Sequence, residues 1–247
     1  MILDDITKHV RLRLQEDMKM LPLEEMMKKA DGTRRPVDFP FERALRQPGL
    51  SYICEVKKAS PSKGVIAESF PYVAIARAYE EAGAAAISCL TERDFFQGHI
   101  QYLKEIAQAV TIQVLRKDFI VHAYQIYEAR AMGAAAVLLI CAILDEKTLQ
   151  SYLELAHSLG LSALVEAHDE REVHMALRCG ARVIGVNNRN LNDFTVSLQT
   201  SLSLRSLVPP SVLFITESGI KTPADIAIIK DHGVQGVLIG ETLMRAP

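Results

Sequence analysis

The chain has 247 residues, 49% of them hydrophobic and 23% charged, and its formal net charge is −2. This composition is typical of a globular protein, and a charge this close to zero does not favour nucleic acid or an anionic membrane surface as a partner. The longest apolar stretch, residues 132–144, is too short to span a bilayer, and the N-terminus lacks the apolar run of a signal peptide. We therefore expect a cytoplasmic protein that binds neither nucleic acid nor membrane.

Residues 1–49 are predicted to form a helical extension. Their apolar residues recur at helical spacing, as is typical of an amphipathic helix. These residues are Val10, Leu12, Leu14, Met18, Leu21, Leu23 and Met26. We expect the extension to pack on the rest of its own chain, and packing on a partner chain is the alternative. A monomer is one assembly that the sequence allows.

Eight apolar segments follow, rich in Val, Ile, Leu and Ala and without clean polar alternation, as expected for parallel strands covered on both faces. The predicted strands are 51–56, 84–90, 112–117, 135–141, 162–166, 182–187, 212–216 and 235–239. Helices are predicted between them, for example Pro71–Glu81, a helix from Asp145 to Leu159 and one that opens at Thr222.

Eight strands with seven intervening helices favour a (β/α)8 TIM barrel over an open doubly wound sheet. No G-x-G-x-x-G follows the first strand, which argues against a dinucleotide-binding unit. We expect a single domain over 1–247, with the extension at 1–49 and the barrel at 50–247. The sequence leaves little room after Gly240, so the final helix is either short or missing from this chain.

The cysteines and histidines show no metal-binding or redox motif. Cys54, Cys89, Cys141 and Cys179 form no C-x-x-C pair, and the seven histidines lack H-x-H and H-E-x-x-H spacing. We expect buried, reduced thiols and no metal site.

Polar residues end most of the predicted strands, although burying such groups without a partner costs free energy. They are Glu55, Lys57, Lys117, Glu166, Asn187 and Glu217. Because side chains alternate along a strand, each shares a face with an apolar residue two positions earlier or later. Glu55 and Lys57 alone would suggest an ion pair, but the recurrence predicts one acid–base cluster at the C-terminal mouth of the barrel.

The loops after the strands supply candidate anion contacts. Ala59–Gly64 follows the first strand as a mobile turn, a lid or an anion-contacting loop, and it lacks the Walker A spacing. Ser218, Gly219, Gly240 and Glu241 follow the seventh and eighth strands, where barrels often bind phosphate.

Other charged residues near the strand ends receive different interpretations. Arg189 is predicted to add a charged contact to the same anion. Lys58, Lys63 and Arg93 are interpreted as surface charges. His168 is interpreted as structural, because the acidic residues after it indicate the start of a polar helix.

Several of these segments together resemble the indole-3-glycerol-phosphate synthase family of tryptophan biosynthesis. They are EVKKASPSKG (55–64), LTE (90–92), LRKDFI (115–120), LVE (164–166), IGVNNR (184–189), ESGI (217–220) and LIG (238–240). The resemblance covers almost the whole chain. It implies closure of the indole ring of 1-(2-carboxyphenylamino)-1-deoxyribulose 5-phosphate, with loss of CO2 and water and without a cofactor.

The resemblance also implies roles for the catalytic residues. Lys117 would be the general acid on the ketone oxygen, and Lys57 would hold the substrate carboxylate or phosphate and share the acid role. Glu166 would assist proton transfer near the anilino nitrogen. Glu55 would pair with the lysines and serve in dehydration.

The remaining matched positions are implied to bind the substrate. Asn187 and Glu217 would orient it, and Ser218 would contact it. Ser60, Arg189, Gly219 and Gly240 would contact the phosphate, with Glu241 beside them. Two alternatives stay open: another phosphate-binding barrel, such as a sugar-phosphate isomerase, and a binding protein without turnover. Family members usually continue through a final helix, and this chain does not.

Overall fold

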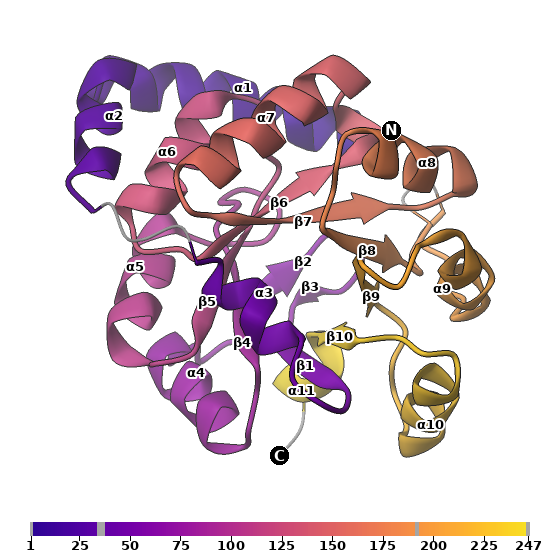
Figure 1. Cartoon of the computed structure of the whole chain (residues 1–247). Coiled ribbons are helices and arrows are strands. Elements are labelled where there is room, and N and C mark those ends of the chain that lie inside the picture. The colour runs from indigo at the N-terminus through magenta and orange to yellow at the C-terminus, as the bar shows by residue number, and fades with distance from the viewer. Residues whose placement is uncertain (1, 34–37, 191–192, 246–247) are drawn as a thin grey trace.

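Eight parallel strands close into a barrel in the computed structural model, which describes residues 2–33, 38–190 and 193–245 (Figure 1). They are β1 (Ser51–Val56), β4 (Ala86–Leu90), β5 (Gln113–Lys117), β6 (Ala136–Ile140), β7 (Ser162–Ala167), β8 (Val183–Asn187), β9 (Leu213–Glu217) and β10 (Gly236–Ile239). Each strand pairs with its neighbours in chain order, and β1 pairs with β10 to close the ring. The predicted (β/α)8 barrel is confirmed, and each predicted strand overlaps an observed one.

Helices alternate with the strands and surround the barrel. They are α4 (Tyr72–Glu81), α5 (Ile100–Ala109), α6 (Ala123–Ala131), α7 (Glu146–Ser158), α8 (Glu170–Arg178), α9 (Gln199–Leu204), α10 (Pro223–Asp231) and α11 (Glu241–Met244), with 3-10 turns at Cys141–Ile143 and Arg205–Leu207. Asp145 caps α7 by accepting from the backbone N–H of Thr148 at 2.8 Å, and Thr222 caps α10 in a capping box, as predicted.

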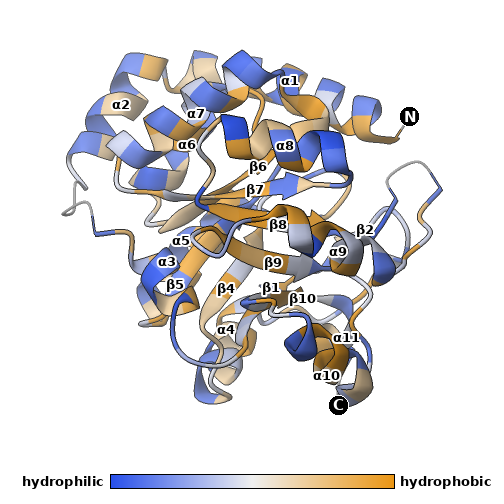
Figure 2. Ribbon diagram, turned by 45° about the vertical axis from the view of Figure 1, so that its right-hand side comes forward, coloured by the Kyte–Doolittle hydropathy of each residue, from blue (hydrophilic) through white to orange (hydrophobic). Residues whose placement is uncertain are grey.

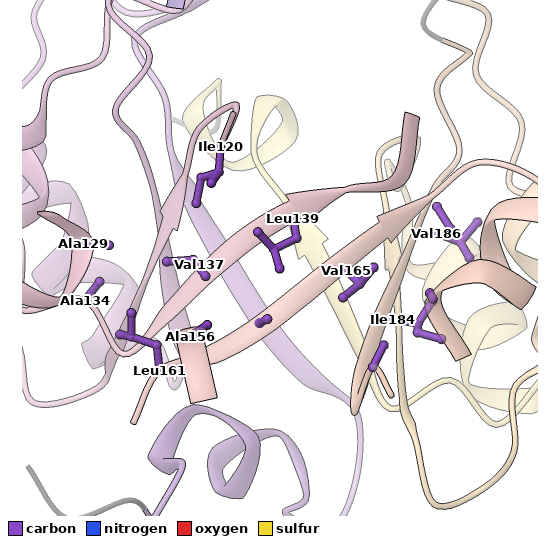
Figure 3. Close-up of a cluster of buried hydrophobic side chains, with 14 of the residues drawn as sticks. Ile120, Ala129, Ala134, Val137, Leu139, Ala156, Leu161, Val165, Ile184 and Val186 are labelled. Carbon is purple, nitrogen blue, oxygen red and sulfur yellow. The ribbon is translucent and has the colours of Figure 1, made fainter. Parts of the chain in front are cut away.

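Strand side chains divide between two apolar layers, which explains the lack of polar alternation. Inward residues such as Ile53, Leu115 and Leu164 fill the lumen. Outward residues pack against the helices, and Figure 3 draws Val137 and Val165 among them. In Figure 2 the strands are accordingly mostly orange, while the surrounding helices carry blue, hydrophilic residues. Both faces of the sheet are buried, as the strand composition predicted.

Three helices precede the barrel: α1 (Ile2–Met20), α2 (Leu23–Asp31) and α3 (Pro40–Leu45). The buried residues Ile6 and Val10 of α1 pack on Val121, which follows β5, and on partly buried aromatic residues of the neighbouring loops. Met26 of α2 packs on Tyr124 of α6. The extension therefore packs on the barrel of its own chain.

Two expectations for this region need correction. Arg93 is not a free surface charge, because its guanidinium lies 3.3 Å from the Asp17 carboxylate of α1. Leu12 belongs to the proposed apolar face but is 55% exposed, since it lies on the side of α1 away from the barrel.

The helix α3 closes the lumen at the end where the strands begin. Its residues Phe41 and Leu45 are fully buried and belong to the same apolar cluster as the inward strand residues. The carboxylate of Glu42 accepts a 2.7 Å hydrogen bond from Arg182, whose guanidinium lies 3.7 Å from the centre of the Phe39 ring. The lumen is thus sealed at one end and polar at the other.

The described residues show further features that bear on the expectations. Cys54, Cys89 and Cys141 are buried and Cys179 is partly buried, and all four are free thiols. No described helix is long and apolar enough to cross a membrane. The described ranges contain no group of three or more His, Cys, Asp or Glu side chains arranged to hold a metal ion.

We predict that Leu45→Ala destabilises the fold by about 2–5 kcal/mol, because it leaves a cavity at the base of the lumen. Urea unfolding measures this change. The matched control is Leu12→Ala, which removes the same atoms from an exposed site and should shift the unfolding free energy by less than about 0.5 kcal/mol. Equal effects of the two substitutions would contradict the role given to α3.

Candidate active site

The polar strand ends meet in one buried cluster at the C-terminal mouth of the barrel. Glu55, Glu166 and Glu217 are at most 4% exposed, and the side chains of Lys57 and Lys117 are each 16% exposed. Each of these five residues comes from the end of a strand or the position just after it. The structure therefore brings together the acid–base cluster that the sequence predicted.

The two lysines are held by carboxylates. The Lys57 Nζ donates to Glu55 Oε1 at 2.5 Å. The Lys117 Nζ lies 3.6 Å from Glu166 Oε2 and 3.8 Å from Glu217 Oε2. The ammonium group of Lys117 thus lies between carboxyl groups from β7 and β9.

Two glycines leave space for the closely packed carboxyl groups of Glu217 and Glu55. A Cβ at Gly185 would lie 2.3 Å from Glu217 Oε1, and a Cβ at Gly240 would lie 2.3 Å from Glu55 Oε1. Any side chain at either position would displace the carboxylate beside it. Glycine at 185 and 240 is therefore required by the placement of the charged groups.

Burial and mutual attraction set the charges of the cluster. Burial alone would raise the pKa of Glu55 and Glu166, but the neighbouring lysines outweigh it and hold both pKa values below their usual range. Burial would likewise lower the pKa of Lys117, whereas Glu166, Glu217 and Glu55 raise it. Lys117 is therefore a charged proton donor at neutral pH.

Glu217 behaves differently from the other carboxyl groups. Burial and the nearby Glu166 carboxylate raise its pKa to about 8, more than Lys117 lowers it. Neither of its oxygens has a hydrogen-bond partner among the described residues, and the 3.8 Å separation from Lys117 is long. Glu217 is therefore a neutral carboxylic acid at neutral pH.

The second oxygen of Glu166 has partners of its own. Asn187 Nδ2 donates to Glu166 Oε1 at 3.3 Å, and His168 Nε2 also lies 3.3 Å from that oxygen. The sequence analysis interpreted His168 as structural because a polar helix was expected to start just after it. That helix start is confirmed, since α8 begins at Glu170, but the interpretation did not include the contact with Glu166. The signal was present in the sequence: residue 168 lies two positions after Glu166 and so on the same side of the chain.

The loop after β1 forms a hairpin of β2 (Ala59–Ser60) and β3 (Gly64–Val65). Ser60 is buried, while Lys63 is exposed and its Nζ lies 3.7 Å from Glu241 Oε1. This contact joins the hairpin to the start of α11, so Lys63 is less isolated than predicted. Lys58 is only partly buried and its carbonyl accepts from the backbone of Ile66.

The loops after β8, β9 and β10 lie next to one another. Thr242 Oγ1 donates to the carbonyl of Ile220 at 2.8 Å, which joins α11 to the loop containing Ser218 and Gly219. Arg189 is partly buried, and its backbone N–H donates to Asn187 Oδ1 at 3.0 Å. The predicted anion-contacting residues therefore flank the acid–base cluster on the side of β8 to β10.

Asn188 is a site residue that the sequence analysis did not single out. Its buried amide donates to Thr216 Oγ1 at 2.8 Å and to the Ser218 carbonyl at 3.1 Å, and its Oδ1 accepts from the Ser201 N–H at 3.0 Å. These bonds fix the backbone at Ser218, which adopts a left-handed conformation with φ of 67°. Asn188 is the polar residue next to Asn187, and nothing else in the sequence distinguishes it.

Comparison with known proteins places this site in a family. The family model for indole-3-glycerol phosphate synthase matches residues 3–247. The chain is 51% identical to the indole-3-glycerol phosphate synthase of Ruminiclostridium cellulolyticum over 100% of this chain and 95% of that protein. It is also 51% identical to the protein of the same name from Lachnoclostridium phytofermentans, with the same coverage.

Solved structures agree on the fold at low sequence identity. An N-acetylmannosamine-6-phosphate 2-epimerase from Clostridium perfringens matches with a TM-score of 0.62 at 15% identity, over 79% of this chain and 88% of that one. A thiamine phosphate pyrophosphorylase from Pyrococcus furiosus matches with a TM-score of 0.58 at 18% identity, over 80% and 88%. These two likenesses support the barrel alone, whereas the family model and the full-length relatives show that the chain belongs to the indole-3-glycerol phosphate synthase family.

Proposed function

We propose that the buried cluster performs the reaction of this family, which makes the chain a carboxy-lyase of tryptophan biosynthesis. The substrate is 1-(2-carboxyphenylamino)-1-deoxyribulose 5-phosphate, and the products are indole-3-glycerol phosphate, CO2 and water. The observation that carries the proposal is the Lys117 ammonium, held between Glu166 and Glu217 at the mouth of the barrel.

Ring closure needs an acid at the ketone oxygen. The anilino nitrogen pushes electrons into the ring as the ring carbon that bears the carboxylate attacks the carbonyl carbon. Lys117 donates a proton to the carbonyl oxygen as the C–C bond forms, so no full alkoxide develops. The resulting iminium accepts the electron pair of the C–CO2 bond when CO2 departs.

Dehydration then completes the indole. The new hydroxyl leaves as water after protonation, and the adjacent carbon, which is bonded to the nitrogen, loses one proton, so the indole forms with its N–H retained. Glu166 lies beside Lys117 and is the carboxylate we assign to proton transfer near the anilino nitrogen. Glu55, paired with Lys57, is assigned to the dehydration step, and Lys57 is assigned to the substrate carboxylate or phosphate and to a share of the acid role.

The rim residues are assigned to substrate orientation. Asn187 and Glu217 lie at the ends of β8 and β9 beside Glu166 and Lys117, where they can orient the aromatic portion. An anchored phosphate fixes the geometry of the ribulose chain, and that fixation lowers the entropic cost of cyclisation. For the phosphate we assign Ser60, Arg189, Ser218, Gly219 and Gly240.

The carboxylate of Glu241 is paired with Lys63 and Arg245, so we assign its backbone, and not its side chain, to the phosphate-binding rim.

The reaction balances without a cofactor. The partner is therefore a small phosphorylated anthranilate derivative. We further propose a single-domain protein that works in the cytoplasm, with a monomer as the simplest assembly.

The direct test is to mix the purified protein with the carboxyphenylamino-deoxyribulose phosphate and to follow indole fluorescence. A rise supports the assignment. A folded protein that binds the substrate without a rise would instead indicate a binding protein. Turnover of a sugar phosphate with no indole formation would indicate an isomerase.

We predict that Lys117→Ala lowers kcat by about 10²- to 10⁴-fold while substrate binding survives, because the acid is lost and the phosphate contacts remain. Steady-state fluorescence and isothermal titration measure the two quantities. Lys147→Ala, an exposed lysine on α7, is the control and should leave kcat unchanged. Undiminished turnover in Lys117→Ala would remove Lys117 from the mechanism.

We predict that Glu166→Gln also loses much of kcat, by about 10²-fold or more, with a smaller effect on substrate binding. Glutamine keeps the shape of the side chain but cannot accept the proton. Stopped-flow turnover compared with equilibrium binding tests this, with the exposed Glu154→Gln as the control. A variant with unchanged kcat would exclude Glu166 from proton transfer.

The raised pKa of Glu217 predicts a pH-dependent cost to stability. In the unfolded chain this carboxyl ionises near its ordinary value of 4.5, whereas in the folded protein it holds its proton up to about pH 8. Its contribution to stability is therefore fully present below about pH 4.5 and is lost as the pH rises to about 8. Glu217→Gln, which is neutral at every pH, should thus gain stability relative to the wild type as the pH rises.

Urea unfolding at pH 5.5 and at pH 8.5 checks this prediction, with Glu154→Gln as the control. The difference between Glu217→Gln and the wild type should be larger at the higher pH. The same difference at both pH values would mean that Glu217 is ionised in the folded site.

A further inference from the structure

His168 lies between two buried carboxylates, of which only one belongs to the site described above. Its Nε2 is 3.3 Å from Glu166 Oε1, and its Nδ1 is 3.0 Å from Glu172 Oε2 on α8. The side chains are 17%, 3% and 7% exposed for His168, Glu166 and Glu172.

Glu172 fixes the orientation of the ring. Its Oε2 accepts from the backbone N–H of His168 at 2.9 Å as well as from the ring, so the backbone and the side chain of residue 168 share one acceptor. The backbone N–H of Glu172 donates in turn to Asp169 Oδ1, the cap of α8, at 2.8 Å. The start of α8 thereby places Nε2 within 3.3 Å of Glu166 Oε1.

The surroundings of His168 favour its imidazolium form. The ring of His168 faces Glu166 from β7 and Glu172 from α8. Glu166 in turn faces the Asn187 amide from β8, the Lys117 ammonium and the neutral Glu217. Burial alone would lower the pKa of His168, but the nearby carboxylates of Glu166 and Glu172 raise it to about 10. Both ring nitrogens therefore carry protons at neutral pH.

We propose that His168 is a positioning residue, which holds Glu166 as a carboxylate and leaves its Oε2 free to work with Lys117. Asn187 and His168 both approach Oε1, while Lys117 approaches Oε2, so the two oxygens have separate tasks. This inference rests on the proposed function, in which Glu166 transfers protons.

Two substitutions separate the two contacts of the ring. The amide nitrogen of glutamine reaches the place of Nε2, and that of asparagine reaches the place of Nδ1. His168→Asn therefore keeps the bond to Glu172 and loses the donor to Glu166, whereas His168→Gln does the opposite. A structural role through Glu172 alone would make Gln the more harmful change, and the proposed role makes Asn the more harmful one for catalysis.

We expect His168→Asn to lower kcat by about 10- to 100-fold, the usual value of a hydrogen bond to a charged group, with a smaller change in KM. The acid limb of its kcat–pH profile should move to higher pH, because Glu166 then takes up a proton more readily. His168→Gln should retain most of kcat and lose thermal stability instead. Wild-type kcat and pH profile in His168→Asn would overturn the proposal, as would an equal loss of kcat in both variants.

The control is His174→Gln. His174 also pairs with a glutamate one turn away on α8, Glu170 at 3.5 Å, but its side chain is 47% exposed and lies outside the site. Its kcat and pH profile should be those of the wild type. A matching loss in this control would mean that the effect comes from α8 as a whole, which would also overturn the proposal.

A readout without turnover separates this inference from the proposed function. Imidazole nitrogen NMR of the full chain should show His168 protonated well above pH 7, and Glu166→Gln should bring its titration down. A His168 that titrates near pH 6.5 in the wild type would overturn the inference even in an active enzyme. If His168 is protonated well above pH 7 but no indole forms, the contact between His168 and Glu166 is supported and the proposed reaction is rejected.

Discussion

The structure depends on one constraint: charged groups buried at the mouth of the barrel must neutralise one another. Lys117 is stable in its charged form because the Glu166 and Glu55 carboxylates lie near it, and Glu166 stays ionised because of Lys117, His168 and Asn187. Removing Lys117 or Glu166 leaves a buried charge without its partner, which costs several kcal/mol. Substitution of one residue therefore changes the protonation of the others, and the cluster acts as a unit.

The barrel makes such a cluster possible. Parallel strands covered on both faces present their C-terminal ends at one rim, so side chains far apart in the sequence converge there. The lumen below is filled by aliphatic side chains and sealed by Phe41 and Leu45 of α3, which keeps water from reaching the carboxylates from beneath. Low polarity below and limited exposure above are the conditions under which Glu217 remains protonated at neutral pH.

The sequence predicted the parts of this arrangement that follow from periodicity. The barrel and the convergence of Lys117, Glu166 and Glu217 follow from apolar runs that end in polar residues, and the helical extension follows from apolar residues at helical spacing. Contacts between segments far apart in the chain could not be predicted from such patterns. The plug formed by α3, the pairing of Arg93 with Asp17 and the bonds of Asn188 depend on tertiary packing that one sequence does not reveal. His168 was visible by its position, but its meaning depended on Glu172, one helical turn further on.

The balance of charge in the site also determines where the substrate must bind. Lys57, Lys117 and His168 match Glu55, Glu166 and Glu172 in number, and Glu217 is neutral, so the cluster has no net positive charge to offer. Beyond the contact assigned to Lys57, a substrate that carries both a carboxylate and a phosphate therefore needs further attraction from the rim. Arg189 and the backbone N–H groups of the loops after β9 and β10 lie at the rim, outside this balanced set. Phosphate binding is thus assigned mainly to the rim and proton transfer to the cluster below it, which allows the acid–base cluster to keep its protonation state while the phosphate is held.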